Sequence, residues 1–121
     1  MAEKIDIEIT EPTDGIATVV LKSPSMSDVD AIGAASRQIE QFVWEKRPHT
    51  VIFDFEAVKF FSSLVLGMLL DVRAKMGAYQ GEVLISAINP QLHRVFKITN
   101  LDKVFRFFPN RESAIEAAQA D

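Results

Sequence analysis

Apolar and polar side chains alternate at the start of the chain, which is typical of a strand with one face in water. Isoleucines at positions 5, 7 and 9 alternate with polar residues as far as Thr10. The turn-forming residues 12–15, Pro-Thr-Asp-Gly, separate this segment from a second β-branched segment at 16–21. The pattern predicts two antiparallel strands joined in a hairpin.

Four later segments have the spacing of helices with one buried face. The first begins at Ser27, an expected N-cap followed by two acids, and ends before Pro48. The second opens at Ser62-Ser63 and ends before Gly77. The third starts at Asn89-Pro90, and the fourth contains the apolar positions Ala114, Ile115 and Ala118.

Short β-rich segments lie between these helices, at residues 51–55, 82–87 and 104–108. Strands that alternate with helices indicate parallel pairing through right-handed crossovers. We therefore predict the α/β class, with about four helices on a mixed sheet of four to five strands. No linker or repeat interrupts the sequence, so residues 1–121 are expected to form a single domain.

Composition excludes several functions. The chain has 121 residues, of which 48% are hydrophobic and 25% charged, as in an ordinary globular domain. Its net charge is -4 and it has no basic run, so nucleic acid is not an expected partner. It has no cysteine, which excludes disulfides and thiol chemistry. With neither a signal pattern nor a long apolar run, we expect a cytoplasmic protein without membrane insertion.

Candidate catalytic residues are few. His49 and His93 have no partner evident in the sequence and are expected at the surface. Asp54 ends a strand where a receiver domain keeps its phosphorylated aspartate, but the residues after the second strand lack the acidic pair of that fold, so a turn-capping role is favoured. No metal, nucleotide or catalytic motif is present. We therefore expect neither an enzyme nor a cofactor.

The pair Ser62-Ser63 is the best candidate site. One hydroxyl can cap the helix, while the other faces solvent as a phosphoacceptor. The free N–H groups and the positive end of the helix dipole would tolerate a phosphate there. The added charge would still oppose any protein surface docked over that end, because burying an unpaired charge is costly. The alternative is a simple helix cap.

Two segments carry a family resemblance. Residues 53–70, FDFEAVKFFSSLVLGMLL, resemble the central segment of STAS domains, the anti-sigma-factor antagonists of bacteria. Residues 89–101, NPQLHRVFKITNL, are similar to a second run of that family, with Asn100 in place of its glycine. Asn is the next-best residue for a left-handed helix terminus, so this difference supports the match. The order of predicted elements also agrees over nearly the whole chain.

The resemblance implies a phosphorylation site. The family motif reads Asp-Ser-Ser/Thr-Gly, and without gaps its four positions fall on Ser62, Ser63, Leu64 and Val65. Only Ser63, at the acceptor position, is retained. The loop at 23–28 also differs from the family's. The resemblance implies that this loop, the Ser62-Ser63 turn and the start of the helix face the partner.

The resemblance also implies how the protein acts. The partner would be an anti-sigma factor with serine kinase activity, released when Ser63 is phosphorylated and bound again after a serine phosphatase acts. Four residues are candidate apolar contacts provided that they are exposed, and the alternative for each is core packing: Met26, Phe61, Leu64 and Met68. A second hypothesis is a constitutive structural subunit of a signalling or transport assembly, in which the serines only cap the helix.

Overall fold

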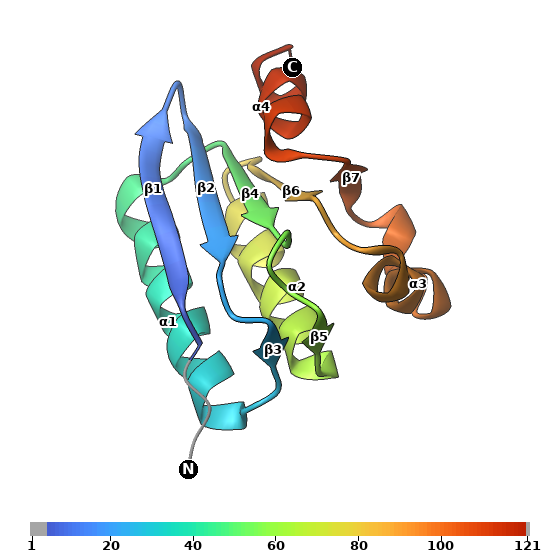
Figure 1. The fold of residues 1–121 in the computed structure, drawn as a ribbon. Coiled ribbons are helices and arrows are strands. Elements are labelled where there is room, and N and C mark those ends of the chain that lie inside the picture. Colours follow the sequence, from blue (N-terminus) through green and yellow to red (C-terminus); the bar gives the residue numbers. More distant parts are fainter. Residues whose placement is uncertain (1–4, 121) are drawn as a thin grey trace.

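The computed structural model describes residues 5–120 of the chain (Figure 1). Its main sheet has the strand order β1-β2-β4-β6-β7. The first two strands pair antiparallel and all other neighbours pair parallel. The bounds of these strands are β1 Ile7–Thr13, β2 Ile16–Leu21, β4 Thr50–Asp54, β6 Glu82–Ser86 and β7 Arg106–Phe108.

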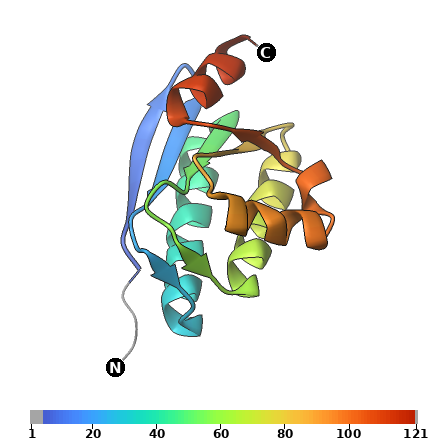
Figure 2. The same cartoon turned by 45° about the vertical axis from the view of Figure 1, so that its right-hand side comes forward.

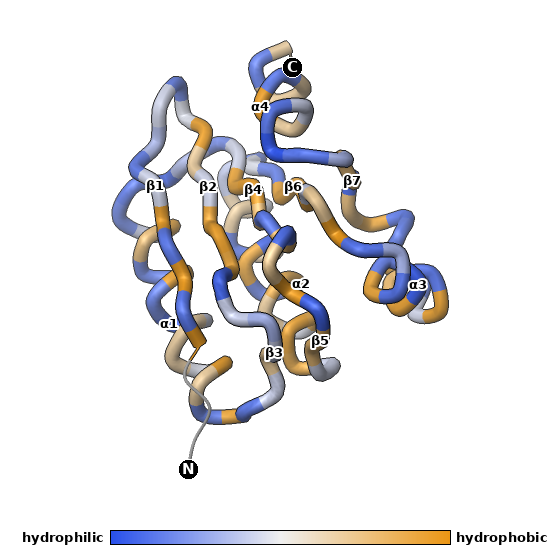
Figure 3. The backbone as a smooth tube through the Cα atoms, viewed as in Figure 1, coloured by the Kyte–Doolittle hydropathy of each residue, from blue (hydrophilic) through white to orange (hydrophobic). Residues whose placement is uncertain are grey.

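Helices cover both faces of this sheet (Figures 1 and 2). On one face, α1 and α2 pack side by side over the larger apolar core, and α4 covers a smaller core on the other face. Figure 3 shows the apolar and polar alternation along β1, which lies at the edge of the sheet. The helices are α1 Val29–Lys46, α2 Ser63–Gly77, α3 Pro90–Ile98 and α4 Arg111–Ala120, with a 3₁₀ turn at Leu101–Lys103.

The predicted fold class is confirmed: residues 5–120 form an α/β fold with four α-helices and a five-stranded mixed sheet. Differences are local. The N-cap of α1 is Asp28 and not Ser27, because the Asp28 carboxylate accepts the N–H of Ala31 at 2.8 Å. The last strand begins at Arg106 and not at residue 104, because the N–H groups of Val104 and Phe105 donate back to the Leu101 carbonyl of the 3₁₀ turn.

A second, two-stranded sheet was not predicted. Strands β3 (Ser25–Met26) and β5 (Phe60–Phe61) pair parallel beside the starts of α1 and α2. Two-residue strands are too short to show a period, so the sequence alone cannot indicate them. Their pairing fixes the two loops that precede these helices against each other.

Candidate functional site

The two serines at the start of α2 divide the roles of cap and exposed hydroxyl as predicted. Ser62 is the N-cap, and its side-chain oxygen accepts the N–H of Leu64 at 3.4 Å. Its backbone N–H donates to the Met26 carbonyl at 2.9 Å, which ties the turn to β3. Ser63 is the first helical residue and is exposed. Within residues 5–120 no hydrogen bond engages its hydroxyl.

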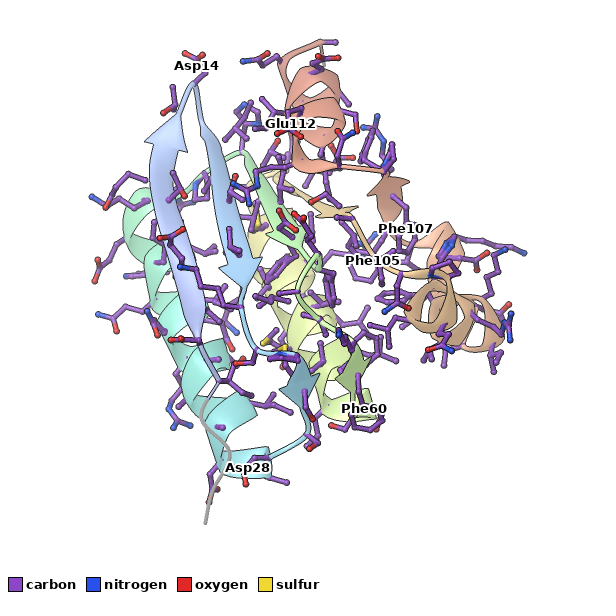
Figure 4. All side chains as sticks on the ribbon, in the orientation of Figure 1. Asp14, Asp28, Phe60, Phe105, Phe107 and Glu112 are labelled. Carbon is purple, nitrogen blue, oxygen red and sulfur yellow. The ribbon has the colours of Figure 1, made fainter. Side chains whose placement is uncertain are left out.

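Phenylalanines anchor the turn that presents Ser63. Phe61 is only 6% exposed and makes edge-to-face contacts with Phe55 and Phe96, at ring centroid distances of 5.9 and 6.0 Å. Its neighbour Phe60 points the other way and is 54% exposed (Figure 4). Because alternate residues of a strand face opposite sides, one aromatic ring holds the turn in place while the other extends the surface.

The candidate apolar contacts separate into two groups. Leu64 is exposed, as its expected role requires. The role of apolar partner contact requires an exposed side chain. Met26, Phe61 and Met68 do not meet this condition, because all three are buried in the core. Met26 and Phe61 are register partners in the small sheet and both pack inward, whereas Met68 lies on the buried face of α2. All three therefore pack in the core under the turn and the start of α2, and do not contact a partner.

A groove of about 360 Å³ runs between the starts of α1 and α2, and Ser63 and Leu64 lie on it. Its wall includes Val29, which is 66% exposed. A Cβ atom added at Gly67 would meet nothing within 4 Å, so this part of the groove is open. Sequence reasoning missed Val29, because it precedes the periodic positions of α1. It also missed Phe60, whose outward direction depends on the unpredicted β5.

Charges around Ser63 are sparse, and of the side chains that line the groove with it only Asp71, about two turns further along α2, is charged. The first turn of α2 contains no acidic side chain. The backbone N–H of Leu64 is taken by Ser62, and that of Val65 donates to the Ser62 carbonyl at 3.0 Å. At the start of α1, Asp28 caps the helix and Asp30 follows in the first turn. The N-terminal dipole of α2 therefore has no carboxylate of its own to offset it.

Asp54 is a structural residue here. Its side chain is 1% exposed, and one carboxylate oxygen accepts a hydrogen bond from Arg111 Nε at 2.8 Å and lies 2.8 Å from Nη2 of the same guanidinium in an ion pair. The other oxygen accepts the N–H of Glu56 at 2.9 Å, which is the predicted turn-capping role. The receiver hypothesis requires an accessible aspartate, which this geometry opposes. The Arg111 partner lies 57 residues away in the sequence, and no local pattern indicates it.

The histidines do not form a catalytic arrangement. His49 is exposed, and its ring nitrogens contact Thr50 Oγ1 at 2.7 Å and the Asp14 carbonyl at 3.0 Å. His93 is half-buried instead of fully solvated, because its ring packs against Phe107 at a centroid distance of 4.5 Å. Within residues 5–120 no three His, Asp or Glu side chains gather as metal ligands. No helix in this part of the chain is long and apolar enough to cross a bilayer.

Fold and site together define a small α/β domain with an exposed serine at the start of its second helix. The STAS domain model matches residues 4–114, and the chain belongs to this family. The resemblance inferred from residues 53–70 and 89–101 is thereby confirmed.

Solved structures agree with this assignment. An anti-sigma factor antagonist from Mycobacterium paratuberculosis is 28% identical, with a TM-score of 0.81 over 96% of this chain and 95% of that chain. The anti-sigma factor antagonist SpoIIAA in its unphosphorylated form is 19% identical, with a TM-score of 0.84 over 96% and 98% of the two chains. A sulfate transporter family protein from Wolinella succinogenes is 13% identical, with a TM-score of 0.75 over 92% and 89%. The last two likenesses concern the fold alone.

Proposed function

We propose that this chain is a non-catalytic regulatory domain that binds a protein partner at the groove between α1 and α2 and is switched by phosphorylation of Ser63. The observation that carries the proposal is that Ser63 is exposed and lines a mainly apolar groove. Val29 and Leu64 line this groove with exposed side chains, and Phe60 is exposed in β5, just before the Ser62 cap. Exposed apolar side chains next to one modifiable hydroxyl suit a protein interface that a charge can close.

The domain itself would tolerate the phosphate. A phosphoserine carries a charge of about -1.5 to -2 at neutral pH, and the positive end of the helix dipole at the start of α2 stabilises that charge. The neutral Ser62 side chain also favours a phosphate on Ser63. Where the family motif has an aspartate, this chain has a neutral cap, so no neighbouring carboxylate in the first turn of α2 repels the phosphate.

A docked partner would not tolerate it. A partner that covers the groove must remove water from the phosphate, and desolvating an ion without a partner charge costs several kcal/mol. Because Ser63 itself lines the groove, the cost falls within the interface and not at its margin. Phosphorylation therefore releases the partner without unfolding the domain.

Relatives support the class of partner. The Mycobacterium paratuberculosis relative is described as an anti-sigma factor antagonist, and the Bacillus cell fate determinant SpoIIAA has been solved in a phosphorylated form. By this analogy the partner is an anti-sigma factor with serine kinase activity, and a serine phosphatase reverses the modification. Such a switch operates in the cytoplasm, through protein contacts and without nucleic acid.

The direct test incubates the purified chain with the anti-sigma kinase of its own organism and ATP, and then maps phosphate by mass spectrometry. We expect one phosphate on Ser63 and none on Ser63→Ala. Ser62→Ala is the matched control, because it changes the adjacent hydroxyl and should retain the label. A chain that binds this kinase but receives no phosphate on Ser63 would contradict the switch.

A second candidate is a constitutive structural subunit of a signalling or transport assembly. It is favoured by the likeness to the Wolinella succinogenes transporter family protein and by the loss of three of the four motif residues. The variant Ser63→Asp distinguishes the two functions. The switch predicts loss of partner binding, whereas a constitutive subunit keeps its partner and loses at most some stability of the helix start.

A further inference from the structure

A second groove lies at the opposite end of the two helices, where α1 and α2 end (Figure 1). It encloses about 430 Å³, and its apolar wall is formed by Val43, Trp44, Ala78 and Tyr79. Ser63 and the turn before α2 do not line it. The proposed partner switch therefore leaves this groove unexplained.

The exposure of Trp44 is the clearest indication that a ligand binds against this wall. It is the only tryptophan of the chain and is 76% exposed, whereas Val43 beside it is 2% exposed. An indole is among the largest apolar surfaces that a side chain can bury, and here the fold leaves most of it in water. A ligand in the groove would cover it.

The groove is preformed. The Tyr79 hydroxyl donates to the Pro48 carbonyl at 2.9 Å, which fixes the aromatic wall. At another point of the lining, Lys75 forms an ion pair with Glu40 at 2.6 Å between α2 and α1. A ligand would therefore have few side chains to order on binding, which is the condition for a useful affinity in a small site.

Arg47 supplies the charge. Its guanidinium lies over the Tyr79 ring at 4.7 Å from the centroid. Stacking uses the flat face of the guanidinium, while its N–H donors point outward in the plane and match a carboxylate. Within residues 5–120 no carboxylate lies within 4.0 Å of it, whereas Glu40, the acid of the lining, is already paired with Lys75. The groove thus combines an apolar wall with the positive charge of Arg47, which must also offset the partial negative charge at the ends of α1 and α2.

We propose that this groove binds a small amphipathic anion, with its apolar body against Trp44 and Tyr79 and its carboxylate on Arg47. The volume falls within the range of about 300–1,000 Å³ that small-molecule sites occupy. A second copy of the chain is less suited, because a stable interface buries about 800 Å² per partner, far more than one such groove offers. This proposal does not depend on the switch at Ser63.

The probe is decanoate, followed through the emission of the single tryptophan, with decanol as the uncharged analogue. We expect a saturable blue shift of Trp44 emission, with half-saturation by decanoate below about 1 mM. Arg47→Gln should weaken decanoate about tenfold, the loss expected for one charge-assisted contact, and leave decanol unchanged. Arg47→Lys, which keeps the charge, should retain part of the preference for decanoate.

Ala78→Gln fills the groove and should abolish both signals. Its matched control is Ala74→Gln, the same change at an exposed position one turn earlier and outside this groove. The proposal is overturned if emission does not saturate, if decanol binds wild type as tightly as decanoate, or if Ala74→Gln has the effect of Ala78→Gln. A dimer that sedimentation shows to depend on Trp44 and that decanoate does not dissociate would also overturn it.

Discussion

Replacing Arg111 with methionine tests the buried ion pair that holds the start of α4 over the sheet. The change keeps much of the aliphatic length of the side chain but removes the guanidinium, and with it both the hydrogen bond and the ion pair to Asp54. Asp54 is then left as a carboxylate in the protein interior with one remaining hydrogen bond, from the Glu56 N–H. Leaving a buried charge without its partner lowers the free energy of unfolding by more than the intact pair contributes to it.

The structure sets the size of the effect. Breaking a buried pair typically costs 3–5 kcal/mol, but the Arg111 side chain is 40% exposed, so water can partly replace it. We expect Arg111→Met to lower the free energy of unfolding by about 3 kcal/mol. Asp54→Asn should lower the free energy of unfolding by only about 1 kcal/mol, because a buried neutral amide does not require a positively charged partner. The double variant should then cost less than the sum of the two.

Urea unfolding of the wild type, the two single variants and the double variant gives all four free energies. The matched control is Arg106→Met, whose ion pair with Glu82 at 3.3 Å lies at the surface and should contribute at most about 1 kcal/mol. If Arg111→Met unfolds within about 0.5 kcal/mol of wild type, or if the double variant costs the full sum, the Asp54 carboxylate is not held by Arg111 as described.

Three further predictions concern local structure. Ser62→Ala should lower the free energy of unfolding by about 0.5–1 kcal/mol, since the capping bond is long, and a loss above about 2 kcal/mol in chemical unfolding would contradict a simple cap. Gly15→Ala should cost about 2 kcal/mol, because Gly15 has φ of +78° and a Cβ would lie 2.4 Å from His49 Cδ2; an unchanged melting temperature would refute this. The hydrogen bond from Lys75 lowers the pKa of Glu40 below its ordinary value of 4.5, so the stability it contributes is present above that pH and is lost as the pH falls through the lowered pKa. Wild type should therefore lose more stability than Glu40→Gln on acidification below about pH 5. If the free energies of unfolding of the two proteins fall equally with pH, this linkage is excluded.

The elements that sequence reasoning found are those with a repeated local signal. Periodic apolar positions mark α1 and α2, and alternation marks β1. The start of α3 is marked by Asn89-Pro90. These signals lie within each segment and do not depend on contacts with distant parts of the chain. The helix start at Asn89-Pro90 is confirmed: α3 begins at Pro90, and Asn89 caps it, with its side-chain oxygen accepting the Leu92 N–H at 2.9 Å.

The rest depends on contacts between distant segments. Strands β3 and β5 exist because the loops before α1 and α2 meet, and this pairing sends Met26 and Phe61 inward and Phe60 outward. Nothing in the local sequence distinguishes these directions. The partnership of Asp54 with Arg111 likewise arises only when α4 returns across the sheet.

The central claim is tested most directly by measuring how tightly the anti-sigma kinase binds the unmodified chain and the chain phosphorylated on Ser63. Isothermal titration with a non-hydrolysable ATP analogue keeps the two forms separate. The account predicts tight binding of the unmodified chain and a loss of at least about a hundredfold on phosphorylation, equivalent to about 3 kcal/mol. Equal affinity of the two forms would contradict it.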